Sequence, residues 1–246
     1  MPATDGSGAG AELHPHEHHH RQVSSGGARA AVFGISDGLV TNVSLILGMA
    51  GAHPGAHVVR LAGLAGLVAG AFSMATGEYV SMRAQTELFE RELARERLSL
   101  HQAPEGERRE LAALYTSRGV APELADQLAE EMMRTPELAL QTHAREELGF
   151  DPESLGSPLV AAVSSFVMFA VGALLPLIPW LVSRGNGALV ASVAVGAVCS
   201  LAVGAALSLF TERPLVRSAL RQLVLSGVAA AVTFGIGRAV GVSGLG

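Results

Sequence analysis

A long apolar run ends in residues 70–83, GAFSMATGEYVSMR, and this stretch decides the fold. Met74, Glu78 and Met82 are spaced four residues apart, so in a helix they project from one face. A carboxylate between two thioethers is costly to place against lipid, but it suits the path of a divalent cation that takes oxygen and sulfur ligands. The plainer interpretation is that the methionines pack and Glu78 lies at the membrane surface. The stretch alone leaves both interpretations open.

The whole chain has the composition of a small polytopic membrane protein. Its 246 residues are 49% hydrophobic and 4% aromatic, with 29 glycines. The spacing of Gly66 and Gly70 predicts close helix packing. Five apolar runs are long enough to cross a hydrocarbon core of about 30 Å; they lie at 29–51, 58–82, 158–182, 187–210 and 219–242. The sequence therefore predicts an all-α membrane protein with five transmembrane helices.

An acidic segment, residues 84–155, separates the second run from the third. It holds 16 acidic residues and 8 arginines, a net charge of −8, whereas the rest of the chain carries +3. Pro104, Pro122 and Pro136 each stand where a proline opens a helix. We expect a helical metal-binding bundle, inserted between the second and third spans and too polar to enter the bilayer. The predicted parts of the chain are a tail at 1–28, spans 1–2 at 29–83, the bundle at 84–155 and spans 3–5 at 156–246.

The tail, residues 1–28, is predicted to be disordered because it is rich in Gly, Ser, Ala and His and has no apolar period. Its histidines suit loose binding of divalent metal, although a solvated low-complexity tail is the plainer interpretation. They are His14, His16, His18, His19 and His20.

Arginines predict how the chain is oriented, and all 17 basic residues are arginine. Five spans place six of the nine arginines outside the acidic segment on the same side as that segment. Because cytoplasmic loops carry the excess of basic residues, we expect the N-terminus and the bundle in the cytoplasm. The lack of lysine and the short chain favour a bacterial inner membrane.

The first span contains Asp37, which with Thr41 and Ser44 forms a polar stripe at helical spacing. An aspartate within a span usually faces a bundle interior or a cavity, and is a functional candidate. The plainer interpretation is that Asp37 caps a short helix break beside Gly38.

Three pairs of metal-ligating residues lie three or four positions apart in the acidic segment, so each pair shares a helix face. If these faces converge, they form an oxygen-rich site with one imidazole, which suits Fe²⁺, Mn²⁺ or Zn²⁺. Acidic pairs on soluble helices are more often solvated and paired with arginine, and Arg108 and Arg109 lie between two of these glutamates. The pairs are Glu92 and Glu96, Glu107 and Glu110, and His143 and Glu147.

Several classes of protein are disfavoured. The chain shows no nucleophile motif, phosphate-binding glycine loop or His-Glu zinc motif, so we expect neither an enzyme nor a bound cofactor. The acidic balance argues against a nucleic-acid partner and for cations. The single cysteine, Cys199, excludes an intrachain disulfide framework.

Three motifs resemble the vacuolar iron transporter family, over residues 29–242. They are FGISDGLV at 33–40, SMATGEY at 73–79 and EELG at 146–149. The resemblance implies a homodimer of five-span subunits with a cytoplasmic metal-binding bundle. It also implies proton-coupled movement of Fe²⁺, and often Mn²⁺, out of the cytosol.

The resemblance also implies site residues. Asp37, Met74 and Glu78 match the family's membrane site, and its bundle glutamates fall on Glu96, Glu107, Glu110 and Glu147. The chain departs from the family at Ser99, where a further glutamate is usual, and at His143 and Ala144, where eukaryotic members carry two methionines.

We therefore expect an antiporter in which divalent metal ions leave and protons enter across a lipid membrane. Two alternatives stay open: a membrane-anchored metal buffer or sensor that does not transport, and a structural protein whose acidic bundle docks a basic partner.

Overall fold

The computed structural model describes residues 26–53, 55–152, 155–211 and 213–242. Over these residues the chain forms eight helices, of which α1, α2, α6, α7 and α8 are long and apolar enough to cross a membrane. Each of the five predicted spans coincides with one of these helices. The helices are α1 (Gly26–Gly51), α2 (Ala56–Gln102), α3 (Pro104–Ser117), α4 (Pro122–Met132), α5 (Pro136–Glu146), α6 (Pro158–Val182), α7 (Gly185–Thr211) and α8 (Leu215–Val242).

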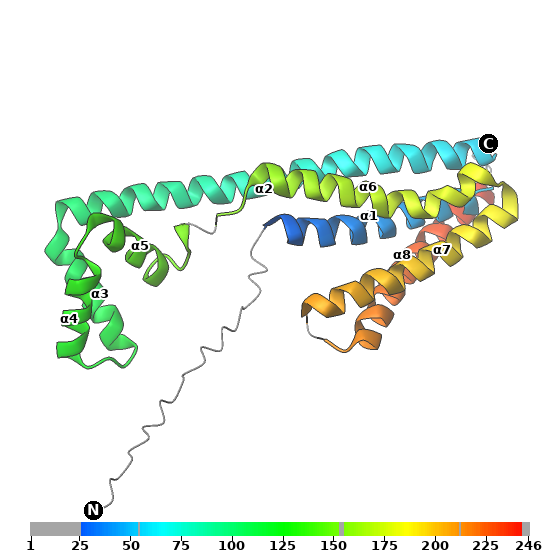
Figure 1. The fold of residues 1–246 in the computed structure, drawn as a ribbon. Coiled ribbons are helices and arrows are strands. Elements are labelled where there is room, and N and C mark those ends of the chain that lie inside the picture. The colour runs from blue at the N-terminus through cyan, green and yellow to red at the C-terminus, as the bar shows by residue number, and fades with distance from the viewer. Residues whose placement is uncertain (1–25, 54, 153–154, 212, 243–246) are drawn as a thin grey trace, which may run out of the picture.

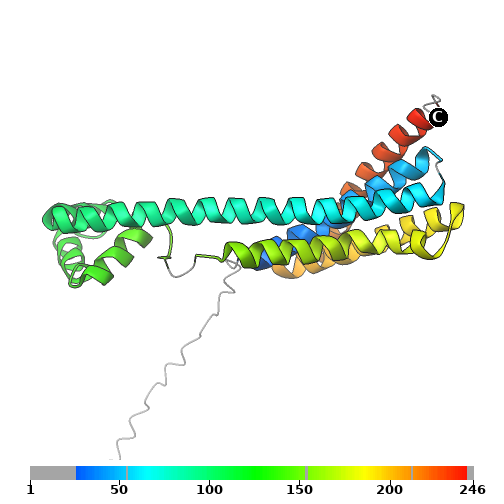
Figure 2. The ribbon, with the colours of Figure 1, turned by 90° about the horizontal axis from the view of Figure 1, so that it is seen from above.

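The longest helix, α2, runs along the whole molecule (Figure 1). Its apolar half packs against α1 and α6, and its polar half carries α3, α4 and α5 at the far end (Figure 2). α1 lies at the centre of the apolar part, because it contacts α2, α6, α7 and α8. The membrane helices and the small bundle are thus joined by one continuous helix.

Glycine lets the central helices approach closely. A Cβ at Gly38 of α1 would collide with the backbone of Phe169 in α6, and one at Gly172 would collide with the backbone of Ile35. The predicted contacts at Gly66 and Gly70 also form, against α1 and α6 respectively. Small residues are how membrane helices gain packing contacts without help from water.

Local sequence signals set where the helices of the bundle begin. α3, α4 and α5 each begin at the predicted proline. The Thr135 hydroxyl caps α5 by accepting a hydrogen bond from the Leu138 N–H at 3.2 Å. A core of Leu111, Tyr115, Ala125 and Ala129 joins α3 to α4, and Met132 and Met133 pack against it.

The first predicted boundary shifts by three residues. α1 begins at Gly26, so the last three residues of the predicted tail belong to this helix, whereas residues 1–25 and all five tail histidines lie outside the described residues. α5 ends at Glu146, and Gly149 beyond it has a left-handed φ of +72°. The chain then returns to α2, where the ring of Phe150 stacks on Phe89 with centroids 4.2 Å apart.

Candidate functional site

A cavity of about 370 Å³ brings together the predicted membrane residues Asp37, Met74 and Glu78. Asp37 comes from α1 and the other two from α2, so the helix pair assembles a set of oxygen and sulfur donors that are far apart in sequence. Phe169 of α6 completes the wall. The lining residues are Asp37, Thr41, Gly70, Ser73, Met74, Gly77, Glu78 and Phe169.

The polar stripe of α1 is shorter than predicted. The Thr41 hydroxyl donates to Asp37 Oδ1 at 3.3 Å, and both side chains are exposed on the surface of the protomer. Ser44 is buried instead, and its carbonyl oxygen accepts a hydrogen bond from Thr233 of α8 at 2.8 Å. Because α8 packs over α1 at this level, the stripe that faces the cavity ends at Thr41.

Glu78 is held by an ion pair within the chain. Its Oε2 lies 3.4 Å from Nη2 of Arg29, and its side chain is only 13% exposed. Of the two methionines on the same helix face, Met74 lines the cavity, whereas Met82 is buried against Ala30 and Ala161. The predicted donor face is therefore Met74 and Glu78, with Met82 acting in packing.

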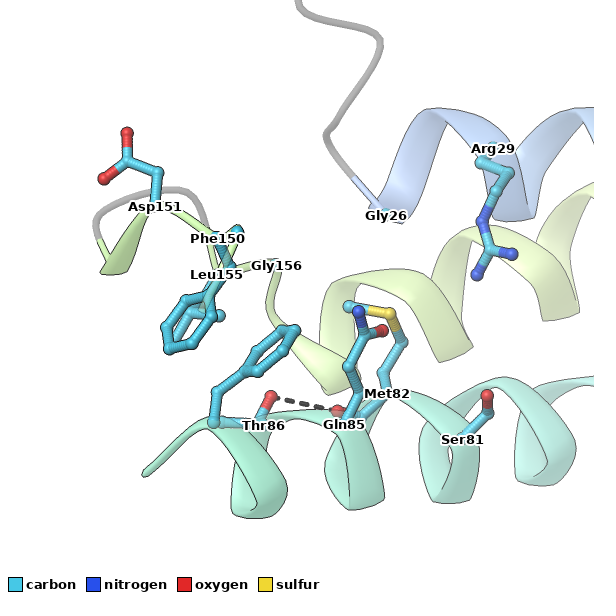
Figure 3. A pocket seen from close by; sticks show the side chains of 12 residues that line it. Gly26, Arg29, Ser81, Met82, Gln85, Thr86, Phe150, Asp151, Leu155 and Gly156 are labelled. Atoms are coloured by element: carbon cyan, nitrogen blue, oxygen red, sulfur yellow. Dashed lines mark hydrogen bonds between the residues drawn. The ribbon is translucent and has the colours of Figure 1, made fainter. Parts of the chain in front are cut away.

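Arg29 also borders a second cavity, which we call the neck pocket. It has a volume of about 570 Å³ and lies where α1 begins, where α2 becomes polar, and where the chain returns from the bundle. Figure 3 shows Arg29 on one side of this space and Phe150 and Leu155 on the other. The neck pocket thus lies along α2 between the membrane cavity and the bundle.

The bundle holds a cluster of four candidate metal ligands. One donor atom from each of Glu96, Glu107, His143 and Glu147 lies within 4.8 Å of the other three. Nδ1 of His143 is 3.1 Å from Glu96 Oε1, 3.2 Å from Glu147 Oε1 and 4.0 Å from Glu107 Oε2. These residues lie on or at the end of three helices, α2, α3 and α5. One residue from each of the first two predicted pairs and both residues of the third pair therefore come together.

Buried donor atoms make this cluster a candidate cation site. Glu96 Oε1 and both ring nitrogens of His143 are buried. Although His143 Nδ1 lies 3.1 Å from Glu96 Oε1, these atoms make no hydrogen bond of good geometry to a described residue. Leaving such atoms unsatisfied is costly. A divalent ion could take Glu96 Oε1 and one ring nitrogen of His143 as ligands, because donors bound at about 2.1 Å lie up to about 4.2 Å apart, and the donor atoms of these four residues lie within 4.8 Å of one another. The mixture of three carboxylates and one imidazole suits Fe²⁺, Mn²⁺ or Zn²⁺.

The electrostatics of the cluster point the same way. Burial raises the pKa of Glu96, and repulsion from Glu107, Glu147 and Glu110 adds to this rise, although His143 opposes it. Burial likewise raises the pKa of Glu107, with repulsion from Glu110 next in importance. Carboxylates held this close resist ionisation, and a bound cation would remove the repulsion.

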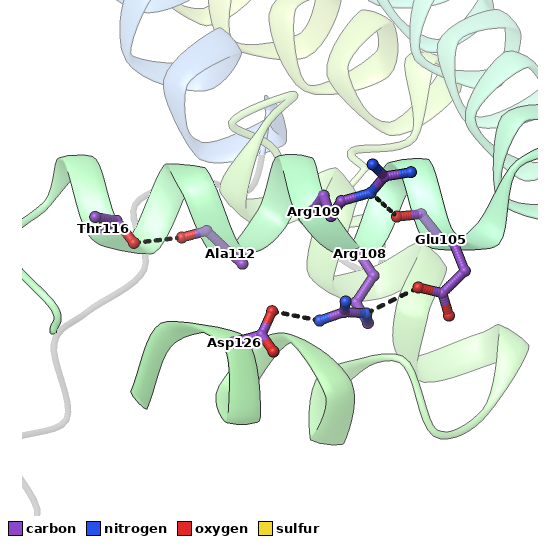
Figure 4. Close-up of polar contacts among 6 residues, drawn as sticks. All are labelled: Glu105, Arg108, Arg109, Ala112, Thr116 and Asp126. Carbon is purple, nitrogen blue, oxygen red and sulfur yellow. Dashed lines mark hydrogen bonds and ion pairs between the residues drawn. The ribbon is translucent and has the colours of Figure 1, made fainter. Parts of the chain in front are cut away.

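The remaining predicted bundle residues lie outside the four. Glu110 is exposed and acts on the cluster through its charge. Glu92 pairs with Arg95 at 2.9 Å. Arg108 and Arg109 do not neutralise the cluster, because both contact Glu105, and Arg108 also pairs with Asp126 of α4 (Figure 4). Ordinary surface pairing therefore accounts for Glu92, but not for the glutamates of the cluster.

Sequence reasoning missed three residues that shape these sites. Arg29 and Phe169 carry no local signal, because their partners lie 49 or more positions away. Buried Asn42 donates its side-chain N–H to the Ala173 carbonyl at 2.6 Å and so joins α1 to α6. A polar residue inside an apolar span was the one signal available for Asn42.

Comparisons with known proteins place this chain in a family. The model of the VIT family matches residues 28–238. The vacuolar iron transporter of Acanthamoeba castellanii is 40% identical over 155 residues, which are 63% of this chain and 56% of that protein. Vacuolar iron transporter 1 of Oryza sativa subsp. japonica is 30% identical over 204 residues, 80% of this chain and 81% of the relative.

Vacuolar iron transporter 1 of Arabidopsis thaliana is 30% identical over 168 residues, 68% of this chain and 67% of that protein. These three relatives are named as transporters and not as enzymes, in agreement with the expectation from the sequence. Because the family model matches residues 28–238, most of its length, the chain belongs to the VIT family of vacuolar iron transporters.

Proposed function

We propose that this chain exports Fe²⁺ or Mn²⁺ from the cytosol across a membrane in exchange for protons. The observation that carries the proposal is that helix α2 links two donor sets. One set is the membrane cavity at Asp37, Met74 and Glu78, and the other is the bundle cluster around Glu96. Glu96 lies 18 positions after Glu78 on α2, which is about 27 Å at helical rise. The relatives' names support a metal ion as the cargo.

In this mechanism the bundle faces the cytosol and collects the metal ion. Only deprotonated ligands bind it, so the cluster releases protons as it fills. The ion passes the neck pocket and reaches Asp37 and Met74. Asp37 or Glu78 then returns a proton when the ion leaves, because a carboxylate in apolar surroundings holds a proton more readily than one in water.

A homodimer completes the pathway in this proposal. Asp37 and Thr41 are exposed, and a Cβ at Gly77 would meet no described atom within 4 Å, so the cavity is open on one face of the protomer. A second copy related by two-fold symmetry would close this face and present a matching set of donors. The assignment to a bacterial inner membrane stays a prediction, since the relatives above are eukaryotic and named for the vacuole.

Uptake into proteoliposomes tests the proposal. We expect Asp37→Asn and Met74→Ala to lower the rate of Fe²⁺ or Mn²⁺ uptake at least tenfold and to abolish the accompanying proton movement. Two control variants make the same kinds of substitution outside the cavity. Glu87→Gln removes a carboxylate that pairs with Arg83 on an exposed face, and Met168→Ala removes a methionine that lines an apolar pocket. Normal uptake in both test variants would refute this pathway. Metal binding without any flux in the unaltered protein would favour the buffer or sensor instead.

A further inference from the structure

Three arginines gather around one pocket at the start of α8, outside the sites described above. The pocket has a volume of about 510 Å³ and is lined by Arg213, Arg217, Ser218 and Arg221. Arg217 and Arg221 are one helical turn apart and so share a face of α8. All three arginine side chains are exposed, whereas Ser218 is only 3% exposed. We call this the arginine pocket.

Its positive charge is not neutralised within the described part of the protein. None of the three arginines forms an ion pair with a described Asp or Glu; Glu212, next to Arg213 in the sequence, lies outside the described residues, and the chain contains no acidic residue after it. Three guanidinium groups around one space repel one another. An anion bound between them would offset this repulsion, and the planar forks of arginine match the oxygens of a phosphate group.

The arginine pocket lies at one end of the apolar helices, so an anion that it binds is one present at the membrane surface. Gln222 donates its side-chain N–H to the Ser36 hydroxyl at 2.7 Å, and Thr233 of α8 bonds to Ser44 of α1 further along, so α8 runs parallel to α1. The arginines therefore lie at the level of the first turns of α1, at the end of the apolar part where α2 leaves it (Figure 1). From Leu223 to Gly237 α8 carries no charged residue.

We propose that the arginine pocket binds a phosphate group at the membrane surface, supplied by the headgroup of an anionic phospholipid or by free inorganic phosphate. The site sits where apolar side chains give way to arginine, which is the depth of lipid phosphates. Ser218 adds a hydroxyl at the pocket wall that can donate to a phosphate oxygen. This assignment does not depend on metal transport.

Thermal unfolding of the full-length protein in mild detergent tests the site. The protein is titrated with phosphatidylglycerol, with zwitterionic phosphatidylcholine, or with inorganic phosphate. The test variant is Arg217→Gln with Arg221→Gln. The matched control is Arg238→Gln, an exposed arginine at the opposite end of the same helix. A variant with Arg217→Lys and Arg221→Lys keeps both positive charges but lacks the planar guanidinium groups that bind two oxygens at once.

We expect phosphatidylglycerol to raise the unfolding temperature of the unaltered protein and of Arg238→Gln. Each surface arginine contributes roughly fivefold in lipid affinity, so the double glutamine variant should need about 25-fold more phosphatidylglycerol for the same shift. The lysine variant should fall between the two, which shows that the loss is not one of folding. An equal effect of inorganic phosphate, in competition with the lipid, would identify free phosphate as the source.

Two results would overturn the proposal. One is the same lipid or phosphate response in the double glutamine variant as in Arg238→Gln. The other is no response of the unaltered protein to either phosphatidylglycerol or phosphate.

Discussion

Glu78 has its counter-ion in the same chain, because Arg29 forms an ion pair with it. Arg29 reaches from the first turn of α1 to Glu78 and lies between the neck pocket and the membrane cavity. In the proposed pathway, its guanidinium lies on the approach of the metal ion to Asp37. There, a divalent ion competes with the Arg29 guanidinium for the Glu78 carboxylate.

Replacement of Arg29 tests this competition. We expect Arg29→Gln to lower the KM for Fe²⁺ or Mn²⁺ uptake about three- to tenfold, because a positive charge close to the cavity no longer opposes the incoming ion. Arg29→Lys should stay near the unaltered value. Arg83→Gln is the control, since Arg83 pairs with Glu87 on an exposed face. An unchanged KM in Arg29→Gln would mean that the ion pair serves only to hold α1 against α2.

The carboxylates of the bundle predict an unusual response to pH. The pKa values of Glu96 and Glu107 are raised above 4.5, chiefly by burial, so the folded protein without metal holds more protons there than the unfolded chain. This contribution to stability is fully present below the unfolded pKa of about 4.5 and is lost as the pH rises through the raised values. Metal should reverse the loss at neutral pH.

The measurement is thermal unfolding of metal-free protein as a function of pH. Relative to a Glu96→Gln, Glu107→Gln variant, the unaltered protein should lose unfolding temperature as the pH rises from about 4.5 to 7. Mn²⁺ at pH 7 should restore it in the unaltered protein only. Parallel curves for the two proteins would show that these carboxyl groups titrate normally.

At the scale of helices, the contact between α1 and α6 holds the membrane cavity in shape. Gly38 lies one residue after Asp37 and directly against the backbone of Phe169, whose ring forms the cavity wall. Any side chain at position 38 would push α6 away and shift Phe169. Glycine at position 38 is therefore needed for packing, and the break that the sequence allowed beside Asp37 does not occur, since α1 is continuous from Gly26 to Gly51.

Substitution of Gly38 should be costly. We expect Gly38→Ala to destabilise the protein by about 1–3 kcal/mol through overpacking, measured by thermal unfolding in detergent. Gly227→Ala is the matched control: it lies in α8, and its Cβ would meet no described atom within 4 Å. Alanine there should leave the stability equal or slightly higher, because it favours the helix. Equal stability of the two variants would contradict the close contact.

The positions of the helices were largely predictable from the sequence, whereas the contacts between distant helices were not. Span positions follow from the length of apolar runs, and helix starts in the bundle follow from prolines, since both signals are local. Asp37, Met74 and Glu78 stood out because polar groups are rare in such runs. The pairing of Glu78 with Arg29 and the burial of Ser44 under α8 depend on how distant helices pack, which no local pattern encodes.

At the scale of the whole molecule, the protomer leaves its membrane cavity open. The exposed side chains of Asp37 and Thr41 and the free space beside Gly77 lie on one surface. A polar surface of this kind is costly against lipid, and a second copy of the chain would cover it.

A large side chain at Gly77 tests the dimer. Gly77→Trp has room within the protomer, but it would block an interface that passes over the cavity. We expect this variant to be monomeric in detergent by light scattering and to lose metal uptake. Gly227→Trp, at an equally open position of α8, should behave as the unaltered protein does. A dimeric Gly77→Trp variant would place the interface elsewhere.

The continuity of α2 has a mechanical consequence. Between Glu78 and Gln102 the helix contains neither glycine nor proline, so it has no built-in hinge. A stiff rod of this kind transmits torque: if capture of an ion by Glu96 tilts the outer end, the inner end at Glu78 must turn with it. Ion binding at Glu96 and the breaking of the Arg29–Glu78 ion pair would then be coupled through the rotation of α2.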